Sequence, residues 1–405
     1  MKQIKIRKGL FLLHEGIGST IFSSQVIEHV KDMNDNNIHM DILSYDLLSK
    51  TWETSNQNLL KARKVINNKI ILKKGINLFI PLLNLVNVLS FMRFIYKNQN
   101  EYDFIHARAD YSAFVAILTK VIHRKPVIWD CRGDLLNEIQ NTLRTKNLII
   151  KSLGKLFIIP QILLRQKINQ RFSDYQIFVS EALYNFNKDK LKINRSIIVP
   201  CLVSEKVFFF DNELRKQTRE RLNYTLNDVV FMYSGSMIGY QFIDGLKLLF
   251  EDIMKLNNSK ILILTSETEK AKRFFNFIDE RRLIIMSSDF EQMNSYYNAS
   301  DFGILIREKL KLNFVASPTK FGEYCLTGLP VIQNDAIDQT MNFALKIGNY
   351  VCVNNLSVEP KKVDERLIIS DKSKNYYSRN VMRVNYLKLY NQIDNKDNLT
   401  KINFK

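Results

Sequence analysis

Residues 317–332 read Ser-Pro-Thr-Lys-Phe-Gly-Glu-Tyr-Cys-Leu-Thr-Gly-Leu-Pro-Val-Ile. Their pattern is typical of a helix that begins near Thr319 and ends at Gly328, because glycine commonly follows the last turn of a helix. The apolar residues after Gly328 begin a buried strand, and residues 301–308 form another apolar run that ends in charge at Arg307. The stretch therefore predicts strand, charged loop, helix and strand in one parallel sheet.

The same alternation of short apolar runs and helical stretches extends over nearly the whole chain. The first half has such runs at residues 9–14, 39–44, 69–72, 103–106, 126–130, 176–179 and 196–199. The second half has them at residues 229–233, 260–265, 283–287, 302–306, 330–334 and 350–353. A charged stretch at residues 211–228 separates the two series. Repeated strand and helix predict an α/β fold whose parallel sheets are covered on both faces.

This organisation predicts two Rossmann-like, doubly wound domains that face each other across a cleft. Residues 1–200 form the first predicted domain and residues 201–372 the second. A helix at residues 373–394 is expected to pack back on the first domain and complete it. The length of 405 residues suits two domains of ordinary size, and 46% apolar residues suffice for packed cores.

The chain is strongly basic. It carries 59 Lys and Arg against 41 Asp and Glu, a formal net charge of +18, which favours an anionic partner. Nucleic acid, an anionic membrane surface and phosphorylated small molecules all fit this charge. The basic residues are scattered rather than clustered with aromatic residues, so we expect no nucleic-acid partner. Four widely spaced cysteines predict reduced core residues in a cytoplasmic protein.

Ligands of open parallel sheets bind beyond the carboxyl ends of the strands. Arg307, Lys320 and Glu323 should meet at that edge of the second sheet, and a spacing of three places Lys320 and Glu323 on one helix face. A diphosphate needs cations and N–H donors, whereas a ribose diol needs a carboxylate. The glycine turn at residues 233–239 would offer backbone N–H groups to a phosphate. A surface ion pair and an ordinary turn are the alternative interpretations.

The stretch at residues 317–332 resembles the donor-site signature of family 4 retaining glycosyltransferases, which have the GT-B fold. Residues 233–236 resemble the phosphate-contacting loop of that family, and residues 102–108 and 126–133 resemble strands of its acceptor domain. The strand that ends in residues 305–308 resembles a subgroup that builds bacterial surface polysaccharides. The resemblance covers most of the chain and is specific in residues 317–332.

This resemblance implies roles for residues of the second domain. Glu323 would hold the hydroxyls of the donor ribose. Gly235 and Ser236 would contact the diphosphate through their backbone, while Lys320 and Arg307 would neutralise its charge. The donor would be a nucleotide-diphosphate sugar bound in this domain.

Two further residues belong to the implied donor site. Ser317 begins the signature, and Met293 ends the segment in which the family holds the nucleobase. The sequence also departs from the family in two places. Val315 occupies the position of the first of two paired glutamates, and Ser236 with residues 240–241 occupies positions where many members have Arg and Lys.

The first domain should bind the acceptor. Residues 14–19 follow the first strand and are polar and glycine-bearing, and His106 ends another strand. Arg132 lies where relatives have a histidine; it suits an acceptor phosphate but is a poor general base because it stays protonated. We take Arg307, Lys320, His106 and Arg132 as the candidate catalytic residues, with a structural role as the alternative for His106.

The reaction implied by the resemblance is hexosyl transfer from a nucleotide-diphosphate sugar to a glycan acceptor, with retention of the anomeric configuration. The favoured acceptor is lipid-linked, in the biosynthesis of capsule, O-antigen or a similar surface polysaccharide. No residues have metal-ligand spacing, so we expect neither a metal nor another cofactor. The alternatives are a sugar-nucleotide epimerase of the same fold and a non-catalytic scaffold that binds nucleic acid or membrane.

Two apolar segments bear on membrane contact. Residues 146–171 alternate apolar clusters with Lys and Arg and contain no acidic residue, a pattern that suits an anionic lipid surface. Such contact would place the protein in the cytoplasm against the inner face of the membrane; a long core helix is the other interpretation. Residues 78–96 are interrupted by polar side chains, which predicts a buried or interfacial helix rather than a membrane span.

Overall fold

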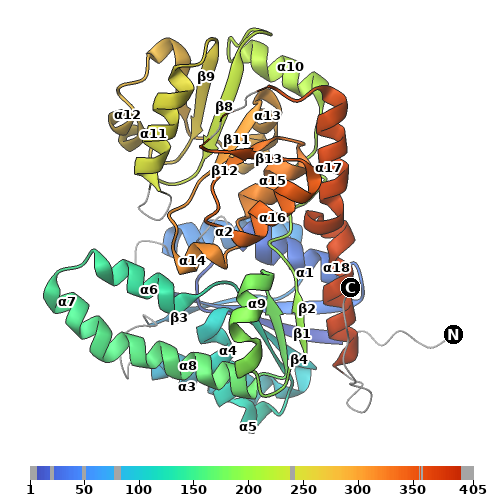
Figure 1. Ribbon diagram of the computed structural model, residues 1–405. Coiled ribbons are helices and arrows are strands. Elements are labelled where there is room, and N and C mark those ends of the chain that lie inside the picture. The colour runs from blue at the N-terminus through green and yellow to red at the C-terminus, as the bar shows by residue number, and fades with distance from the viewer. Residues whose placement is uncertain are drawn as a thin grey trace. The chain divides into compact units, whose positions relative to one another are not determined.

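A computed structural model describes residues 7–18, 22–47, 52–76, 84–237, 242–354, 356 and 359–393. The chain forms two compact units (Figure 1). Unit 1 contains residues 1–199 and 383–405, and unit 2 contains residues 200–382. Each unit is built on one parallel sheet.

Unit 1 contains a seven-stranded sheet in the order β3-β2-β1-β4-β5-β6-β7. Its strands are β1 (Arg7–Leu13), β2 (Ile38–Leu47), β3 (Ile70–Gly75), β4 (Phe104–Arg108), β5 (Val127–Cys131), β6 (Tyr175–Phe178) and β7 (Ser196–Ile198). Every residue of β4 and β5 is buried, so both faces of the sheet centre are covered, as parallel sheets require.

Helices connect these strands in unit 1. The α-helices are α1 (Glu28–Asn34), α2 (Trp52–Val65), α3 (Leu85–Asn98), α4 (Ala109–Leu118), α5 (Lys120–His123), α6 (Leu135–Arg144), α7 (Leu148–Leu153), α8 (Ile159–Phe172) and α9 (Glu181–Asn187). Short π and 3-10 turns are η1 (Phe22–Ile27), η2 (Gln99–Glu101), η3 (Gly154–Ile158) and η4 (Lys188–Lys190).

Unit 2 contains a six-stranded sheet in the order β10-β9-β8-β11-β12-β13. Its strands are β8 (Val229–Ser234), β9 (Ser259–Leu264), β10 (Leu283–Met286), β11 (Phe302–Leu305), β12 (Val331–Gln333) and β13 (Tyr350–Cys352). Its helices are α10 (Asn212–Arg221), α11 (Ile243–Met254), α12 (Thr268–Phe274), η6 (Glu280–Arg282), η7 (Phe290–Gln292), α13 (Met293–Ala299), α14 (Lys311–Phe314), α15 (Thr319–Leu326), α16 (Asp338–Ile347) and α17 (Val363–Tyr377).

Alternating residues of the unit 2 strands fill two cores. Val230 and Met232 of β8 belong to a cluster that includes residues of α13, α15 and α17. Phe231 and Tyr233 belong to a second cluster with residues of α11 and α12. Successive side chains of a strand point to opposite faces, so this sheet is covered by helices on both sides. All the predicted apolar runs overlap strands, and the prediction of two parallel-sheet α/β domains is confirmed.

The end of α15 agrees with the expected glycine stop. Gly328 has a left-handed φ of +63°, its N–H donates to the Cys325 carbonyl, and the Leu329 N–H donates to the Tyr324 carbonyl. A Cβ at this position would lie 2.1 Å from the Arg366 carbonyl oxygen. Glycine is therefore required both by the backbone conformation and by the close approach of α17.

A helix is observed within the segment predicted at residues 373–394, and its residues from 383 onward belong to unit 1, but the predicted start at residue 373 is wrong. The segment contains the end of α17 and a separate helix, α18 (Arg379–Gln392), with Ser378 extended between them. Here the chain pairs with Val203, whose N–H donates to the Tyr377 carbonyl and whose carbonyl accepts from the Arg379 N–H. These hydrogen bonds replace helical ones. The break between the two helices is therefore caused by a contact with a distant residue and could not be predicted from the local sequence.

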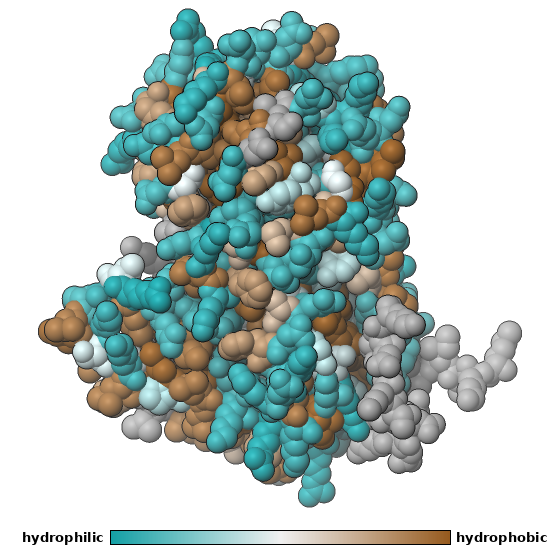
Figure 2. All heavy atoms as spheres, in the orientation of Figure 1, coloured by the Kyte–Doolittle hydropathy of each residue, from teal (hydrophilic) through white to brown (hydrophobic). Residues whose placement is uncertain are grey.

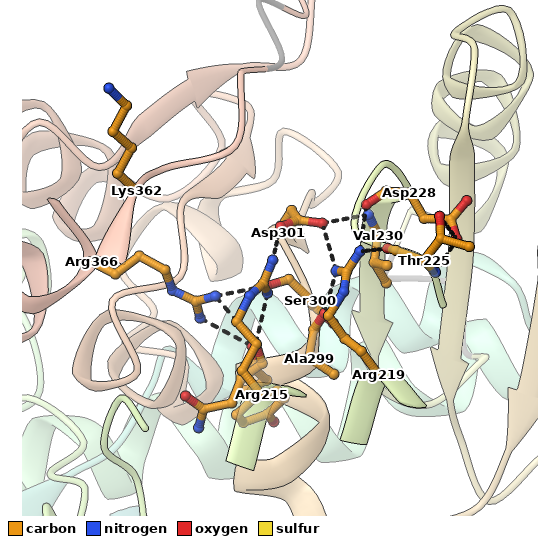
Figure 3. A network of polar contacts seen from close by, with 12 residues as sticks. Arg215, Arg219, Thr225, Asp228, Val230, Ala299, Ser300, Asp301, Lys362 and Arg366 are labelled. Atoms are coloured by element: carbon orange, nitrogen blue, oxygen red, sulfur yellow. Dashed lines mark hydrogen bonds and ion pairs between the residues drawn. The ribbon is translucent and has the colours of Figure 1, made fainter. Parts of the chain in front are cut away.

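A buried network of charge joins α10, α17 and the end of α13 in unit 2 (Figure 3). Asp301, directly before β11, forms ion pairs with Arg215 at 2.5 Å and Arg219 at 3.2 Å and accepts from the Val230 N–H. Arg366 of α17 donates to the carbonyls of residues 297, 298, 300 and 327. The guanidinium groups thus stabilise the carboxyl end of α13, where backbone carbonyls lack helical partners.

The predicted helix at residues 78–96 is observed in part, as α3, while residues 77–83 lie outside the described ranges. One side of α3 is buried, including Val88, Phe91 and Ile95. Within the described part of the chain, no helix is long and apolar enough to span a bilayer.

Candidate functional site

The centre of the unit 2 sheet collects the candidate donor residues at one edge. β8 and β11 are parallel neighbours, and β9 lies on the other side of β8, so the chain winds in opposite directions from this point. Gly235 and Ser236 follow β8, Arg307 lies two residues after β11, and α15 begins at Thr319. The carboxyl edge at such a switch point is where doubly wound sheets bind nucleotides.

Glu323 is oriented by a chain of hydrogen-bonded hydroxyl groups. Its carboxylate, 8% exposed, accepts a 2.7 Å hydrogen bond from the Tyr297 hydroxyl. The Ser234 hydroxyl lies 3.3 Å from the hydroxyls of both Tyr297 and Tyr324. Burial raises the pKa of Glu323, while the charge of Lys320 and the Tyr297 hydrogen bond oppose that rise. The side chain is thus a fixed acceptor at the edge of the sheet.

Lys320 and Arg307 supply positive charge beside this carboxylate. Burial lowers the pKa of Lys320; Glu323 opposes this shift and Arg307 adds to it. Among the described residues, the Lys320 ammonium group has no hydrogen-bond or ion-pair partner. The Arg307 backbone is fixed by Asn334, which accepts from its N–H at 3.2 Å and donates to its carbonyl at 2.7 Å. Two cations beside one carboxylate suit an anionic ligand.

The turn after β8 is shaped by its own hydrogen bonds. The Gly235 N–H donates to the Leu264 carbonyl, so it is not available to a ligand. The contribution of this glycine to a ligand site would be the space left by its missing side chain. A Cβ here would lie 2.8 Å from the Tyr233 hydroxyl, which donates to the Ser236 carbonyl. The Met237 N–H donates to Glu267 at 2.6 Å. The Ser236 N–H has no partner among the described residues; residues 238–241 lie outside them.

Ser317 and Met293 have contacts with the protein interior. The Ser317 hydroxyl accepts from the Cys201 N–H at 3.1 Å, which ties the start of unit 2 to the loop before α15. Met293 is the first residue of α13 and packs against the core beneath the site. Val315, at the position of the missing glutamate, is buried. The predicted donor-binding roles of Ser317 and Met293 remain predictions.

His106 was expected among the catalytic residues, and its surroundings favour a positioning role instead. Its side chain has no exposed surface; Nε2 lies 3.1 Å from Asp130 and Nδ1 lies 2.7 Å from the Tyr390 hydroxyl of α18. Burial lowers the pKa of His106 against the opposing effect of Asp130. A neutral imidazole therefore donates to Asp130 and accepts from Tyr390, which in turn lies 2.9 Å from His29 Nε2.

Arg132 lies directly after β5 and contacts Asp130 through Nε at 2.8 Å and Nη2 at 2.7 Å. Burial disfavours the Asp130 carboxylate, but Arg132 and His106 outweigh that effect and hold its pKa below the ordinary range. Asp130 is therefore ionised and orients Arg132 at the carboxyl edge of the unit 1 sheet. His14, in contrast, is buried, stacks on Tyr45 and has a pKa lowered to about 3 by burial.

Within the described ranges, no group of three or more His, Cys, Asp or Glu side chains could hold a metal ion. Sequence reasoning missed Ser234, Tyr297 and Tyr390, which position candidate residues from distant elements. Ser234 ends β8 inside the predicted glycine turn, so its location offered a signal. Tyr297 and Tyr390 offered none beyond their place in helical stretches.

Comparison with known proteins identifies the fold. No protein-family model and no curated protein sequence matches this chain. Sucrose-phosphate synthase from Thermosynechococcus elongatus superposes with a TM-score of 0.68 at 13% identity, over 96% of this chain and 99% of that one. HepE from Anabaena in complex with UDP gives 0.68 at 13% identity, over 95% and 100%. WaaG, a glycosyltransferase involved in lipopolysaccharide biosynthesis, gives 0.61 at 8% identity, over 96% and 100%. The chain has the GT-B fold of these proteins.

Proposed function

We propose that this protein is a retaining glycosyltransferase that moves a hexosyl group from a nucleotide-diphosphate sugar to a glycan acceptor. The observation that carries the proposal is the cluster of Arg307, Lys320 and Glu323 at the carboxyl edge of the unit 2 sheet. It offers two cations for a diphosphate and one fixed carboxylate for a ribose diol. The resemblance of residues 317–332 to the family 4 signature and the UDP bound in HepE support it.

Catalysis rests on stabilising the diphosphate leaving group. Lys320 and Arg307 neutralise the charge that develops as the bond to the sugar breaks, and the first turn of α15 and the Ser236 N–H add hydrogen-bond donors. Glu323 fixes the ribose and so aligns the phosphates with these groups. No metal ion takes part in this proposal, because the protein itself supplies the positive charge.

The donor site is tested by calorimetric titration with UDP, GDP and ADP. One of these should bind, and Glu323→Ala should weaken that binding about tenfold to hundredfold, because a buried ribose diol loses a charged acceptor. The matched control is Glu251→Ala on α11, which removes an exposed glutamate and should leave the affinity unchanged.

If Glu323→Ala binds the nucleotide as tightly as wild type, the assigned donor site is wrong. Incubation with nucleotide sugars of the same base, followed by mass spectrometry, then separates the enzyme classes. Transfer to an acceptor supports the proposal. Isomerisation of the donor without transfer would identify an epimerase, and tighter binding of single-stranded DNA than of any nucleotide would identify a nucleic-acid-binding protein.

The acceptor in this proposal is lipid-linked, and the protein binds the inner face of the membrane during surface polysaccharide biosynthesis. WaaG, described as acting in lipopolysaccharide biosynthesis, supports this pathway class.

In unit 1, α6 and α8 lie side by side, and α7 with the adjoining η3 forms a projecting tip (Figure 1). Apolar residues gather at this tip (Figure 2), and Leu148, Ile149 and Leu156 are 78%, 71% and 64% exposed.

These exposures argue against a core role for the tip, although α8 itself is partly internal. Arg165 is buried over the Tyr111 ring at 4.6 Å and so does not face solvent as expected from the sequence. From residue 139 to residue 173 the chain has no acidic side chain. An apolar tip flanked by lysines is suited to insertion into an anionic lipid surface.

Flotation with vesicles tests this contact. Wild type should float with vesicles of phosphatidylglycerol and phosphatidylcholine more than with phosphatidylcholine alone. The triple variant Leu148→Ser, Ile149→Ser, Leu156→Ser should lose at least about tenfold in partitioning, because each apolar side chain contributes roughly 1.5–3 kcal/mol when it leaves water. The matched variant Val121→Ser, Leu226→Ser, Leu248→Ser also removes exposed apolar residues and should float normally. Equal flotation of both variants would refute membrane contact by the tip.

A further inference from the structure

A second cluster of charge lies at the carboxyl edge of the unit 1 sheet, around residues of β4 and β5. Arg108 is the last residue of β4, and its Cα pairs with that of Asp130 on β5. Arg132 follows β5, and Glu15 follows β1. Ligands of doubly wound sheets bind beyond this edge, so the cluster occupies the place where unit 1 would meet a substrate.

The single buried carboxylate of the cluster is committed to Arg132. Asp130 Oδ2 accepts from Arg132 Nε at 2.8 Å and lies 2.7 Å from Nη2, and it also accepts from His106. Arg108 Nη1 lies 3.9 Å from the same oxygen, beyond hydrogen-bonding distance. Two guanidinium groups therefore share the one buried carboxylate of Asp130, and the second carboxylate near Arg108 is the half-exposed Glu15.

Arg108 has an unsatisfied donor. The residue is 6% exposed, and its Nη1 is buried without a hydrogen-bond partner. Its closest carboxylate besides Asp130, among the described residues, is Glu15, which accepts from Nε at 3.3 Å. The Glu15 side chain is 46% exposed, so it can turn into solvent at little cost. A buried guanidinium group with an unpaired N–H is unfavourable unless an acceptor reaches it.

We infer that Arg108 and Arg132 form an anion-binding site that takes a phosphate or carboxylate group of the acceptor, with Glu15 as a carboxylate that the ligand displaces. The site rests on the proposed function for the identity of its ligand. Arg108 provides the free N–H and Arg132 is oriented by Asp130. A planar guanidinium pair suits two oxygens of one anion.

The geometry also connects this site with the apolar tip. β5 ends at Cys131, Arg132 follows it, and α6 begins three residues later at Leu135 and leads towards α7. A helix of the length of α6 spans about 15 Å. An acceptor whose anionic group lies beside an apolar anchor, such as a lipid phosphate, would match the charged cluster at one end of α6 and an apolar surface at the other.

The experiment titrates inorganic phosphate into the full chain saturated with UDP, or with whichever nucleoside diphosphate binds, at constant ionic strength. Wild type should bind phosphate under these conditions. Arg108→Met should weaken phosphate binding by about tenfold or more, and Glu15→Gln should strengthen it roughly two- to fivefold by removing the competing carboxylate. The control is Arg124→Met, an exposed arginine before β5 that should change nothing.

Nucleotide binding is the readout that separates the two proposals. A chain that binds the nucleotide but not phosphate overturns the anion site and leaves the donor site intact. If Arg108→Met does not fold, Glu15→Gln decides, since this residue is exposed; unchanged or weaker phosphate binding in Glu15→Gln overturns the site. Unchanged affinity in folded Arg108→Met overturns it as well.

A second arm identifies the source of the anion. Glu15→Gln and wild type are compared in flotation with phosphatidylcholine vesicles that contain phosphatidic acid. Stronger flotation of Glu15→Gln, abolished by free phosphate, supports a lipid-borne phosphate. Equal flotation together with stronger binding of free phosphate supports a soluble anionic acceptor.

Discussion

Replacement of Lys320 by methionine should lower kcat for sugar transfer about 100- to 1,000-fold, the usual loss when one preorganised group that stabilises developing charge is removed. Lys320 lies in the first turn of α15, its side chain is desolvated, and Arg307 is near enough to lower its pKa. A charge held in such a place interacts most strongly with the leaving diphosphate, which gains negative charge as the sugar departs. The KM for the donor should rise much less than kcat falls.

The pH dependence of nucleotide binding provides a second readout for Lys320. Its pKa is lowered in the free protein, and a bound diphosphate should raise it again. Binding is then coupled to proton uptake, and the affinity falls as the pH rises through the pKa of the free protein. Lys320→Met should abolish this dependence, whereas Lys255→Met, at the exposed end of α11, should keep both the dependence and kcat. A variant at Lys320 with normal kcat would exclude this residue from catalysis.

The local character of the donor cluster explains why sequence alone predicted it. Lys320 and Glu323 belong to one helix turn, and Arg307 follows the strand before it, so strand and helix periodicity suffice to bring the three together. The strands were predictable for the same reason, because each is a short apolar run between helical stretches. Gly328 was predictable because a left-handed residue after a helix almost requires glycine.

Contacts between distant residues were not predictable in this way. The Tyr297 hydroxyl that donates a hydrogen bond to Glu323 comes from α13. The Tyr390 hydroxyl that is hydrogen-bonded to His106 is 284 positions away in the chain. Both are helical tyrosines whose neighbours are decided by packing. The extended Ser378 likewise depends on Val203 rather than on its own residue type. The candidate site residues at the strand ends could therefore be predicted from the sequence, whereas the residues that orient them could not.

β11 connects the donor site with the buried charge network of unit 2. Arg307 lies beyond its carboxyl end, and Asp301 lies directly before its first residue. Asp301 and Arg307 are six residues apart, up to about 20 Å along an extended chain. Changes at Asp301 should therefore alter the stability of unit 2 without altering the chemistry of the donor site.

Asp301→Asn should destabilise unit 2 by about 3–5 kcal/mol, the usual cost of leaving buried charges without their partner. The carboxylate is the only acidic group that pairs with Arg215 and Arg219 among the described residues. Both arginines also donate to neighbouring carbonyls at the end of α13, Arg215 to that of Asn298 and Arg219 to that of Ala299. Asparagine keeps the size and can still accept from the Val230 N–H, so the loss reports charge rather than volume. With a slope of about 2 kcal/mol per molar urea, the midpoint should fall by roughly 2 M.

The measurement is urea denaturation followed by circular dichroism, with and without the nucleoside diphosphate that binds best. The transition that shifts with nucleotide belongs to unit 2, because ligand stabilises the unit that holds it. Asp252→Asn is the matched control, since it removes the acidic partner of Lys255 in an exposed ion pair. It should lower the free energy of unfolding by less than about 0.5 kcal/mol. Folded Asp301→Asn should bind the nucleotide with wild-type affinity, because the network lies at the opposite end of β11. A loss of affinity at unchanged stability would mean that Asp301 acts on the donor site and not on the packing of α10, α13 and α17.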